Sequence, residues 1–409
     1  MIGGCLCQAF QEHTHIIASA SDERRLNKVY FSMSRTMMIK SSFTIGITGN
    51  IATGKSVLRR MLTNAGVFGI DADTLANRLL YPGGGAYQQV IDTFGPEIKS
   101  DHVHISNKKL GQIVFNDPKA LKQLENITHP LVIETILRYI QAAQQPIVSI
   151  EAIKLIEAGL GNHCDQLWVS YASFESQMRR LQDSRGLSKG EASIRITAQP
   201  PQIEKLSQAD VIINTETSFK DTWIKTCSAL NDTIQSRTDV LPLHINISKD
   251  WLASTVNALP LKQVELAWEE LAGKTHSELY ECLGLKTVLA ILKNKHIRAF
   301  IIWDNWNFTG TLLKVYPLAF YKSFPTLVFN AFEEHAQINR MEFLLIADEM
   351  ATAGGIHPGQ FGYDQQRIAD IVYLAWQIAA QKAISNNQTK VWRKVLTQPF
   401  ELTNETKFD

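Results

Sequence analysis

Five short runs of apolar residues follow one another between residues 43 and 214, and each is nearly continuous in hydrophobicity. They are Phe43–Thr48, Val67–Asp71, Ile147–Glu151, Leu167–Tyr171 and Val211–Asn214. Runs of this length and composition predict strands that are covered on both faces of a parallel sheet. Amphipathic segments such as Ser56–Asn64 and Ser173–Asp183 lie between them and predict helices. This alternation predicts a doubly wound α/β domain over about residues 41–235.

The pattern changes after about residue 236. Segment 236–249 is rich in turn residues and predicts a linker, and six of the eight tryptophans lie beyond it. We expect helices over Asp250–Leu271, Ser277–Lys293, Phe324–His335 and Gln365–Lys382, and strands over Arg298–Trp303, Thr309–Tyr316 and Glu342–Ala347. Residues 250–409 are therefore predicted to form a separate C-terminal α+β domain with an aromatic core of its own.

Residues 1–40 have no sustained apolar period and predict a disordered leader, or a segment upstream of a start at Met38. The chain has 41 Lys+Arg and 40 Asp+Glu residues, so its net charge of +1 gives no strong field toward nucleic acid or a membrane surface. No run of about 18 apolar residues is present, which argues against a membrane-spanning helix. The five scattered cysteines lack zinc-site spacing. We expect a reduced, cytoplasmic protein.

The strongest chemical signal is the sequence GNIATGKS at residues 49–56, which fits G-x-x-x-x-G-K-[ST]. A predicted strand leads into it and a predicted helix leads out, as the motif requires. Glycines let the backbone turn its N–H groups toward phosphate, a lysine neutralises the β/γ-phosphates, and a serine hydroxyl ligates Mg²⁺. A glycine turn capped by serine is the structural alternative. The residues expected to bind the nucleoside triphosphate are Gly49, Ala52, Thr53, Gly54, Lys55, Ser56 and Val57, with Ser56 as the metal ligand.

Two carboxylates, Asp71 and Asp73, follow the second predicted strand. Because ligands bind beyond the carboxyl ends of strands in open α/β sheets, these residues are placed beside the phosphate loop. One aspartate can accept the proton of an alcohol, and the other can hold a metal-bound water or a ribose hydroxyl. The alternative is that both only cap the following helix, Thr74–Leu80.

With several later segments, these features resemble the dephospho-CoA kinase family over about residues 43–230. The segments are LGQIVF at 110–115, ITHP at 127–130, EAGL at 157–160, GLS at 186–188, Arg195-Ile196 with Gln199, and Ala209-Asp210 followed by Asn214. That family transfers the γ-phosphate of ATP to the ribose 3′-hydroxyl of dephospho-CoA, the last step of coenzyme A synthesis. The resemblance implies a P-loop kinase core, a helical insertion over about Thr74–Gln145 with a turn at His129-Pro130, and a lid over about Arg179–Gln199.

Carried over by position, the resemblance implies ATP and Mg²⁺ as cofactors and gives roles to single residues. Asp73 would be the general base, with Lys55 and the lid residue Arg180 as further catalytic groups. Guanidinium groups near the Gly-Leu-Ser turn would suit neutralisation of transition-state charge. The residues implied to bind dephospho-CoA are Asp71, His129, Glu151 and Arg195. For each there is a structural alternative: an exposed basic helix face, a histidine that stabilises a turn, or an exposed strand-end carboxylate.

The sequence departs from the family at several places. Asn107 stands where the family usually has arginine, with Lys108 and Lys109 as candidate substitutes. The usual lid arginine falls on Ser184, and Glu216 stands where glycine is expected. A lysine cannot reproduce bidentate phosphate binding, so these changes affect acceptor binding more than ATP binding. Lys205, near the lid, is expected to be solvated.

The C-terminal residues match no motif that identifies a function. The order strand, strand, helix, strand, helix resembles an acetyltransferase of the GNAT type, but residues 316–320 lack the Gly-rich loop that such enzymes use for pyrophosphate. An interaction module is the alternative for this part. For the whole chain, the alternatives to dephospho-CoA kinase are a kinase for another small alcohol or nucleoside, and a non-catalytic nucleotide sensor with a C-terminal effector domain. The oligomeric state is not predicted.

Overall fold

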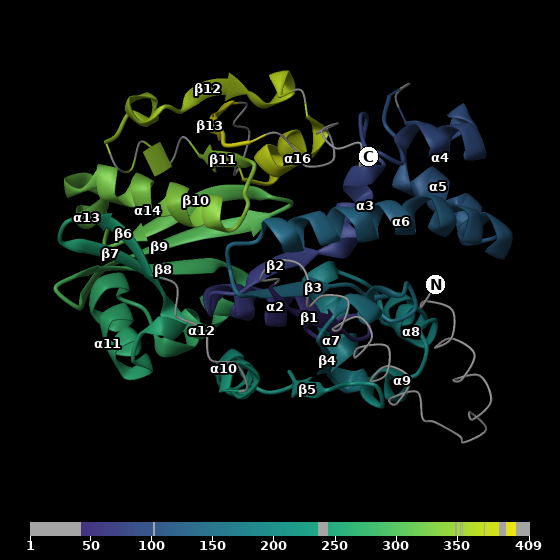
Figure 1. Cartoon of the computed structure of the whole chain (residues 1–409), viewed down its shortest axis with the longest axis horizontal. Coiled ribbons are helices and arrows are strands. Elements are labelled where there is room, and N and C mark those ends of the chain that lie inside the picture. Colours follow the sequence, from purple (N-terminus) through teal and green to yellow (C-terminus); the bar gives the residue numbers. More distant parts are fainter. Residues whose placement is uncertain are drawn as a thin grey trace, which may run out of the picture. The chain divides into compact units, whose positions relative to one another are not determined.

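The computed structural model describes residues 42–100, 103–235, 244–347, 350–351, 353, 355–371, 373–383 and 390–397. The expected leader, residues 1–40, lies outside the described residues, and so does segment 236–243 of the expected linker. The described residues form two sheets, one drawn in purple to teal and the other in green to yellow in Figure 1.

The first sheet has five strands in the order β2-β3-β1-β4-β5, and neighbouring strands pair in parallel. The strands are β1 (Phe43–Thr48), β2 (Phe68–Asp71), β3 (Ile147–Glu151), β4 (Gln166–Tyr171) and β5 (Val211–Asn214). They match the five predicted runs to within one residue at each end. The prediction of a parallel α/β core with a P-loop kinase arrangement is confirmed.

Helices connect these strands as the alternating pattern predicted. Helix α2 (Lys55–Asn64) follows the phosphate loop, and α10 (Phe219–Gln235) follows the last strand. The insertion contains α3 (Ala72–Leu79), α4 (Tyr87–Phe94), η1 (Pro96–Ile98), α5 (Asn107–Val114) and α6 (Pro118–Ala142). The lid region contains α7 (Phe174–Arg185), α8 (Lys189–Thr197) and α9 (Gln202–Leu206), and η2 (Leu160–His163) precedes β4.

The turn expected at His129-Pro130 is wrong, because both residues lie inside helix α6. Proline removes one backbone hydrogen bond and usually bends or ends a helix. Here the helix continues because one side of it is packed: Thr128, Val132 and Ile136 are all buried. Tertiary burial therefore outweighs the local preference of the proline.

The second sheet has eight strands in the order β12-β13-β11-β10-β9-β8-β7-β6. Only the pair β10–β11 is parallel among its pairings, and the others are antiparallel. Its strands are β6 (His244–Ser248), β7 (Trp251–Thr255), β8 (Thr287–Lys293), β9 (His296–Trp306), β10 (Thr309–Tyr316), β11 (Phe343–Ile346), β12 (Asp364–Arg367) and β13 (Lys390–Val395). A second, C-terminal sheet is thus present, and β6 falls within the segment expected to be a linker.

Helices lie between these strands, but three of the expected C-terminal helices are partly wrong. The first begins with strand β7, the second ends in strand β8, and the last begins with strand β12. All but one residue of β8 are buried, so its sequence lacks the alternation that would have marked it as a strand. The helices are α11 (Leu261–Ala272), α12 (His276–Leu285), α13 (Leu318–Ser323), α14 (Pro325–Ile338) and α16 (Leu374–Ala383), with short turns η3 (Val256–Ala258), η4 (Pro358–Phe361) and η5 (Ile368–Asp370).

The centre of the second sheet is buried on both faces, whereas its edge strands β6 and β12 are partly exposed. Alternate residues of β8 point to opposite sides: Val288 and Ala290 join one hydrophobic cluster, while Leu289 and Ile291 join another. Each of these two clusters also contains residues of the kinase-like part, residues 41–235. Met61 and Trp223 belong to the first, and the strands and insertion helices around β2 belong to the second. Many C-terminal aromatic residues therefore pack in cores that both parts share, whereas Phe343, Tyr373 and Trp376 belong to a cluster of C-terminal residues.

A buried ion pair lies where the insertion meets the second sheet. Arg78 of α3 and Glu342 before β11 are both fully buried, and their side chains are 2.7 Å apart. The hydroxyl of Tyr139 and the indole N–H of Trp376 also donate to Glu342, at 3.0 and 3.3 Å. The Arg78 guanidinium lies 5.0 Å from the ring centre of Phe308, which stacks on Tyr139. These contacts fix α3, the helix that carries Asp73, against the second sheet.

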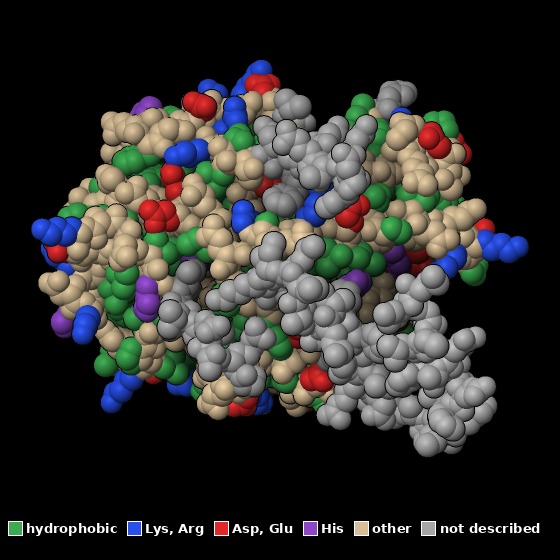
Figure 2. Space-filling model, in the orientation of Figure 1, with side chains coloured by type: hydrophobic (Ala, Val, Ile, Leu, Met, Phe, Trp, Pro, Cys, Tyr) green, Lys and Arg blue, Asp and Glu red, His purple; other side chains and the backbone are tan. Residues whose placement is uncertain are grey.

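Charged side chains are mixed on the face of the molecule that Figure 2 draws. Blue and red side chains are interspersed there, in keeping with the net charge of +1. Within the described residues, no helix combines the length and the apolar character needed to cross a bilayer.

We expect Arg78→Met to lower the free energy of unfolding by about 3–5 kcal/mol, because it leaves the buried Glu342 carboxylate without its cation. Urea denaturation of the full chain measures this loss. The double variant Arg78→Met/Glu342→Gln should recover part of it, since no charge is then left unpaired. Asp370→Asn, which breaks the exposed Arg367–Asp370 pair, is the control and should barely move the urea midpoint. Equal effects of both single variants would contradict the prediction.

Candidate active site

The phosphate loop has the backbone geometry that its glycines predict. Gly49 has φ 148° and Gly54 has φ 95°, conformations that residues with a Cβ rarely adopt. A Cβ on Gly49 would also lie 2.5 Å from the Ser170 hydroxyl. Gly54 is the N-cap of α2, so the first turn of that helix opens directly onto the loop. Exposed N–H groups at a helix N-terminus form an anion site, and this one follows strand β1 at the carboxyl edge of the sheet.

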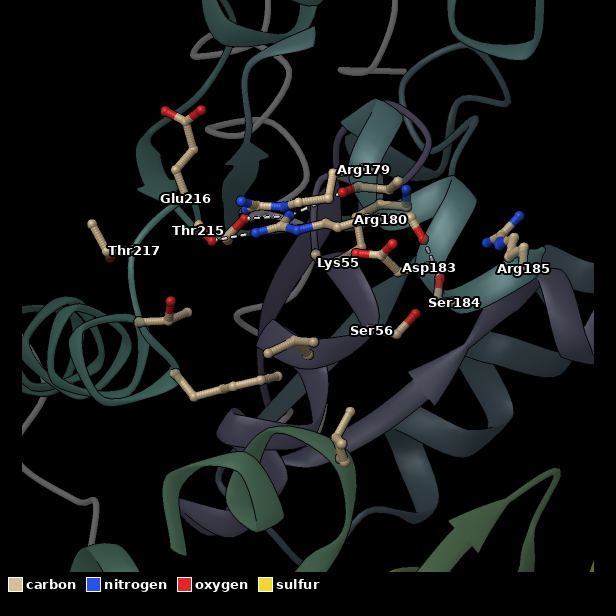
Figure 3. Close-up of a pocket in the computed structure, with 16 residues that line it drawn as sticks. Lys55, Ser56, Arg179, Arg180, Asp183, Ser184, Arg185, Thr215, Glu216 and Thr217 are labelled. Carbon is tan, nitrogen blue, oxygen red and sulfur yellow. Dashed lines mark hydrogen bonds between the residues drawn. The ribbon is translucent and has the colours of Figure 1, made fainter. Parts of the chain in front are cut away.

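A cavity of about 560 Å³ opens at this loop (Figure 3). Its lining comes from the loop and α2, from the lid helix α7, from the segment after β5 with the start of α10, and from Leu285 at the end of α12. Figure 3 shows Arg179, Arg180 and Arg185 of α7 on one side of the cavity and Thr215, Glu216 and Thr217 on another. The cavity therefore joins a phosphate-binding loop to a basic helix, a combination suited to a polyphosphate.

Lys55 is the buried cation of the loop. Its side chain is 7% exposed, and its ammonium donates to the carbonyl of Asn50 at 3.0 Å. Burial lowers the pKa of Lys55 to about 8, although the carboxylates of Glu151 and Asp73 act in the opposite direction. The charge of Lys55 thus interacts with the charges of both Glu151 and Asp73. Its expected catalytic role requires such a position.

Glu151 at the end of β3 connects the loop to a second cation. The Ser56 hydroxyl donates to one of its oxygens at 2.6 Å, and Arg59 donates to the other at 2.7 Å. Arg59 also lies 3.8 Å from Asp71. Glu151 is therefore buried and paired, and the alternative of an exposed strand-end carboxylate is wrong. The chain Ser56–Glu151–Arg59–Asp71 orders the edge of the sheet from which the loop emerges.

The two aspartates after β2 differ in their surroundings. Asp71 caps helix α3, because its carboxylate accepts the N–H of Thr74 at 2.9 Å. Asp73 lies in the first turn of α3 with an outer side open to solvent, and it accepts the N–H of Ile153 at 3.3 Å. Desolvation, with Asp71 adding to it, raises the pKa of Asp73 to about 6. A carboxylate of raised pKa beside a phosphate loop is suited to accept a proton.

The lid is fastened to the phosphate loop by hydrogen bonds. The side chain of Asn50 donates to the carbonyl of Pro200 at 2.8 Å, and the N–H of Ile51 donates to the Gln199 side chain at 2.7 Å. Arg180 donates to the carbonyl of Ala52 at 3.0 Å and also binds Thr215, as the dashed lines in Figure 3 show. In this structure Arg180 joins the loop to the segment after β5.

None of the four expected acceptor-binding residues lines this cavity, although Ser56, which does, donates to Glu151. His129 is a half-buried residue of α6, and burial lowers its pKa. Arg195 is exposed on α8. Among the candidate substitutes for the family arginine, Lys109 donates to the carbonyl of Lys99, and Lys108 is exposed on the same helix. The lining of the cavity includes neither His129 nor Arg195.

Sequence reasoning missed or misjudged three polar residues near the loop. Arg59 was not singled out, although it is the buried partner of Glu151. Asn50 was regarded only as a variable position of the motif. Lys205 is 5% exposed rather than solvated. Its ammonium donates to the carbonyl of Ile153 and pairs with the carboxylate of Glu157. Arg59 is four residues after Lys55, so both lie on the same face of the predicted helix. This spacing was the available signal that Arg59 is near the phosphate loop.

Comparison with known proteins agrees with this geometry. A family model described as dephospho-CoA kinase matches residues 43–221. The dephospho-CoA kinase of Carboxydothermus hydrogenoformans is 41% identical over 181 residues, which are 44% of this chain and 88% of the relative. The chain belongs to the dephospho-CoA kinase family. The dephospho-CoA kinase of Geobacter sulfurreducens is 38% identical over 191 residues, 44% of this chain and 97% of the relative. A solved dephospho-CoA kinase from Campylobacter jejuni matches at 26% identity with a TM-score of 0.37, covering 48% of this chain and 98% of that one.

One departure from the dephospho-CoA kinase pattern has a structural explanation. Glu216, which stands where glycine was expected, accepts the N–H of Ser173 at 2.9 Å and the hydroxyl of Ser176 at 3.3 Å. Hydrogen bonds from Ser173 lower the pKa of the Glu216 carboxyl. The glutamate therefore caps the start of α7 and ties this lid helix to the segment after β5.

We expect kcat/KM for this dephospho-CoA kinase family member to be bell-shaped in pH. As the expected general base, Asp73 would have to be ionised to accept a proton, so the rate should fall as pH drops below about 6. Lys55 must be protonated to attract phosphate, so the rate should also fall above about 8. Steady-state assays at saturating Mg²⁺ from pH 5 to pH 10 measure both limbs.

The same data contain an internal control. Bound triphosphate adds negative charge beside Lys55, which should move the alkaline limb of kcat to higher pH than that of kcat/KM. A kcat/KM that stays constant across the whole range would contradict both assignments.

Proposed function

We propose that this chain transfers the γ-phosphate of ATP to the ribose 3′-hydroxyl of dephospho-CoA, giving coenzyme A and ADP. Membership in the dephospho-CoA kinase family supports this activity. The single observation that carries it is that Lys55, the buried lysine of the phosphate loop, and the raised-pKa carboxylate of Asp73 lie close enough for each charge to shift the pKa of the other. One group suits the phosphate donor, and the other suits the alcohol acceptor.

Asp73 is proposed as the general base. Its carboxylate accepts the proton of the ribose 3′-hydroxyl while that oxygen forms a bond to the γ-phosphorus. The bond from the γ-phosphorus to the β–γ bridging oxygen breaks, and ADP leaves with its electron pair. The proton stays on Asp73 until it is released to water. Its contact with the N–H of Ile153 orients the carboxylate for this task.

Lys55, the loop N–H groups and the lid arginines are proposed to stabilise the phosphate charge. Charge on the transferring phosphoryl group is spread over its equatorial oxygens, so fixed cations and N–H donors lower the barrier. Arg180 would act mainly as a positioning residue while it binds Ala52 and Thr215. Arg179 and Arg185 line the cavity as Arg180 does, and they are proposed as the lid cations that neutralise the phosphate charge.

The residues around Ser56 fit a magnesium ion. A hydroxyl and a carboxylate, those of Ser56 and Glu151, lie 2.6 Å apart, and Mg²⁺ prefers oxygen ligands. In the described part of the chain no group of three or more His, Cys, Asp or Glu side chains is set to hold a metal. That suits Mg²⁺, which usually takes one or two protein oxygens together with phosphates and waters. When bound there, Mg²⁺ would neutralise charge on the β- and γ-phosphates.

Acceptor binding is proposed to use Asp71, Glu151, His129 and Arg195. Asp71 and Glu151 lie at the strand ends beside Asp73, with Arg59 between them. His129 comes from the insertion, to which the resemblance assigns acceptor binding, and Arg195 comes from the lid. The cytoplasmic location, the GNAT-like interpretation of residues 250–409 and the domain boundaries stay predictions. Neither a kinase for another alcohol nor a nucleotide sensor is favoured by the relatives.

The direct test is release of ADP by the purified full chain in the presence of ATP, Mg²⁺ and dephospho-CoA. We expect release to depend on dephospho-CoA and to be absent with adenosine. Asp73→Asn should lower kcat by at least about 100-fold, the scale of general-base catalysis. Lys55→Met should lower kcat/KM for ATP by a similar factor, because it removes a transition-state cation.

Asp92→Asn, an exposed carboxylate of α4 that bonds Gln88, is the matched control for Asp73→Asn and should keep the wild-type rate. ADP release that is the same with and without dephospho-CoA would reject the acceptor. Wild-type turnover in Asp73→Asn would reject the general base while leaving the acceptor standing.

A further inference from the structure

The cavity at the phosphate loop has a wall that the family match does not cover. Leu285, the last residue of α12, lines this cavity together with Val57 and Phe219. The family model ends at residue 221, so Leu285 comes from the C-terminal part. In Figure 3 the green ribbon of that part lies along one side of the cavity. A residue outside the matched region can therefore contact a ligand bound in the cavity.

Helix α12 is held tightly in this position. The side-chain amide of Asn64, the last residue of α2, donates to the carbonyls of Leu283 and Lys286, both at 2.8 Å. Its oxygen accepts the N–H of Val288 at 2.7 Å. Asn64 is buried, so breaking these bonds would leave polar groups unpaired in the core. The end of α12 thus has a fixed place relative to the phosphate loop.

Gly284 allows the close approach that brings Leu285 to the cavity. A Cβ on Gly284 would lie 2.6 Å from Cδ1 of Phe219 and 3.2 Å from Cγ1 of Val57. The first distance is shorter than any real Cβ contact, so a larger residue would push α12 away from Phe219. The backbone of α12 therefore rests directly on the ring that lines the cavity.

The cavity has both charged and apolar lining residues. Lys55 and the lid arginines are charged, whereas Val57, Phe219 and Leu285 are apolar, and Gly284, next to Leu285, packs against both Val57 and Phe219. Leu285 is 42% exposed, so much of its side chain is free to contact a ligand. Asp71 and Asp73 do not line this cavity, which separates it from the acceptor side. A flat, partly apolar group attached to a polyphosphate matches this arrangement.

We propose that Leu285 contacts the nucleoside end of ATP, so that the C-terminal part completes the nucleotide site of this kinase. The proposal rests on the proposed function, because it takes ATP as the ligand of the cavity. Residues that bind the triphosphate come from the family-matched region. The apolar contact for the nucleoside is shared between Phe219 of that region and Leu285 of the C-terminal part.

The test compares two ligands on the full chain: ATP, and inorganic tripolyphosphate, which carries the phosphate chain without a nucleoside. Leu285→Ala should raise the dissociation constant for ATP, measured by equilibrium dialysis, by about fivefold, since it removes apolar contact area. The dissociation constant for tripolyphosphate should stay unchanged. In turnover assays KM for ATP should rise while KM for dephospho-CoA stays the same.

Two variants separate a ligand contact from general damage to the fold. Leu285→Met keeps the apolar contact and should restore the affinity for ATP. Leu318→Ala removes a leucine that is 41% exposed, closely matched to Leu285, and should leave both ligands unaffected. Wild-type affinity for ATP in Leu285→Ala would overturn the proposal, and so would an equal loss for both ligands. A wild-type chain that binds ATP but does not phosphorylate dephospho-CoA would instead reject the proposed function and leave this contact standing.

Discussion

The fixed position of helix α2 is the constraint on which the rest of the site depends. Its first residue, Lys55, faces the phosphate cavity, and its last residue, Asn64, is buried in hydrogen bonds to α12 and β8. At 1.5 Å per residue, a helix of 10 residues joins these ends over roughly 15 Å. Because a helix of this length is stiff, a shift at either end moves the other. The phosphate loop is therefore positioned partly by residues more than 200 positions away in sequence.

Electrostatics adds a second constraint along the middle of the same helix. Arg59 is buried between Glu151 and Asp71, so the positive charge of α2 is neutralised by the ends of β3 and β2. On the outer side of the helix, Arg60 lies 2.8 Å from Asp304 of β9. Burial would raise the pKa of Asp304, but Arg60 and Lys286 hold it below its ordinary value. Charged contacts of two consecutive residues of α2 thus connect the parallel sheet, the phosphate loop and the C-terminal sheet.

How far the sequence predicted this structure depends on whether the deciding contacts are local. The phosphate loop and the strand ending at Asp71 follow from short patterns within their own segments, and both were predicted correctly because these patterns can be recognised without knowing their distant partners. Strand β8 was mistaken for a helix because it is buried on both faces and has no alternation. The family resemblance implied a turn at His129-Pro130, whereas packing keeps α6 continuous. The Arg78–Glu342 pair and the Asn64 contacts had no local signal, since each joins distant segments.

The C-terminal sheet is part of the same folded unit as residues 41–235. The contacts of a loosely associated domain with those residues would be exposed and polar. Instead Met61 and Trp223 share a hydrophobic cluster with α11, α12 and β8, and Tyr139 stacks on Phe308 with ring centres 4.5 Å apart. Burial on this scale means that the free energy of folding is shared between the two parts. Since α3 and α2 carry Asp73 and Lys55 and both pack on the C-terminal sheet, the geometry of phosphate transfer depends on that sheet as well.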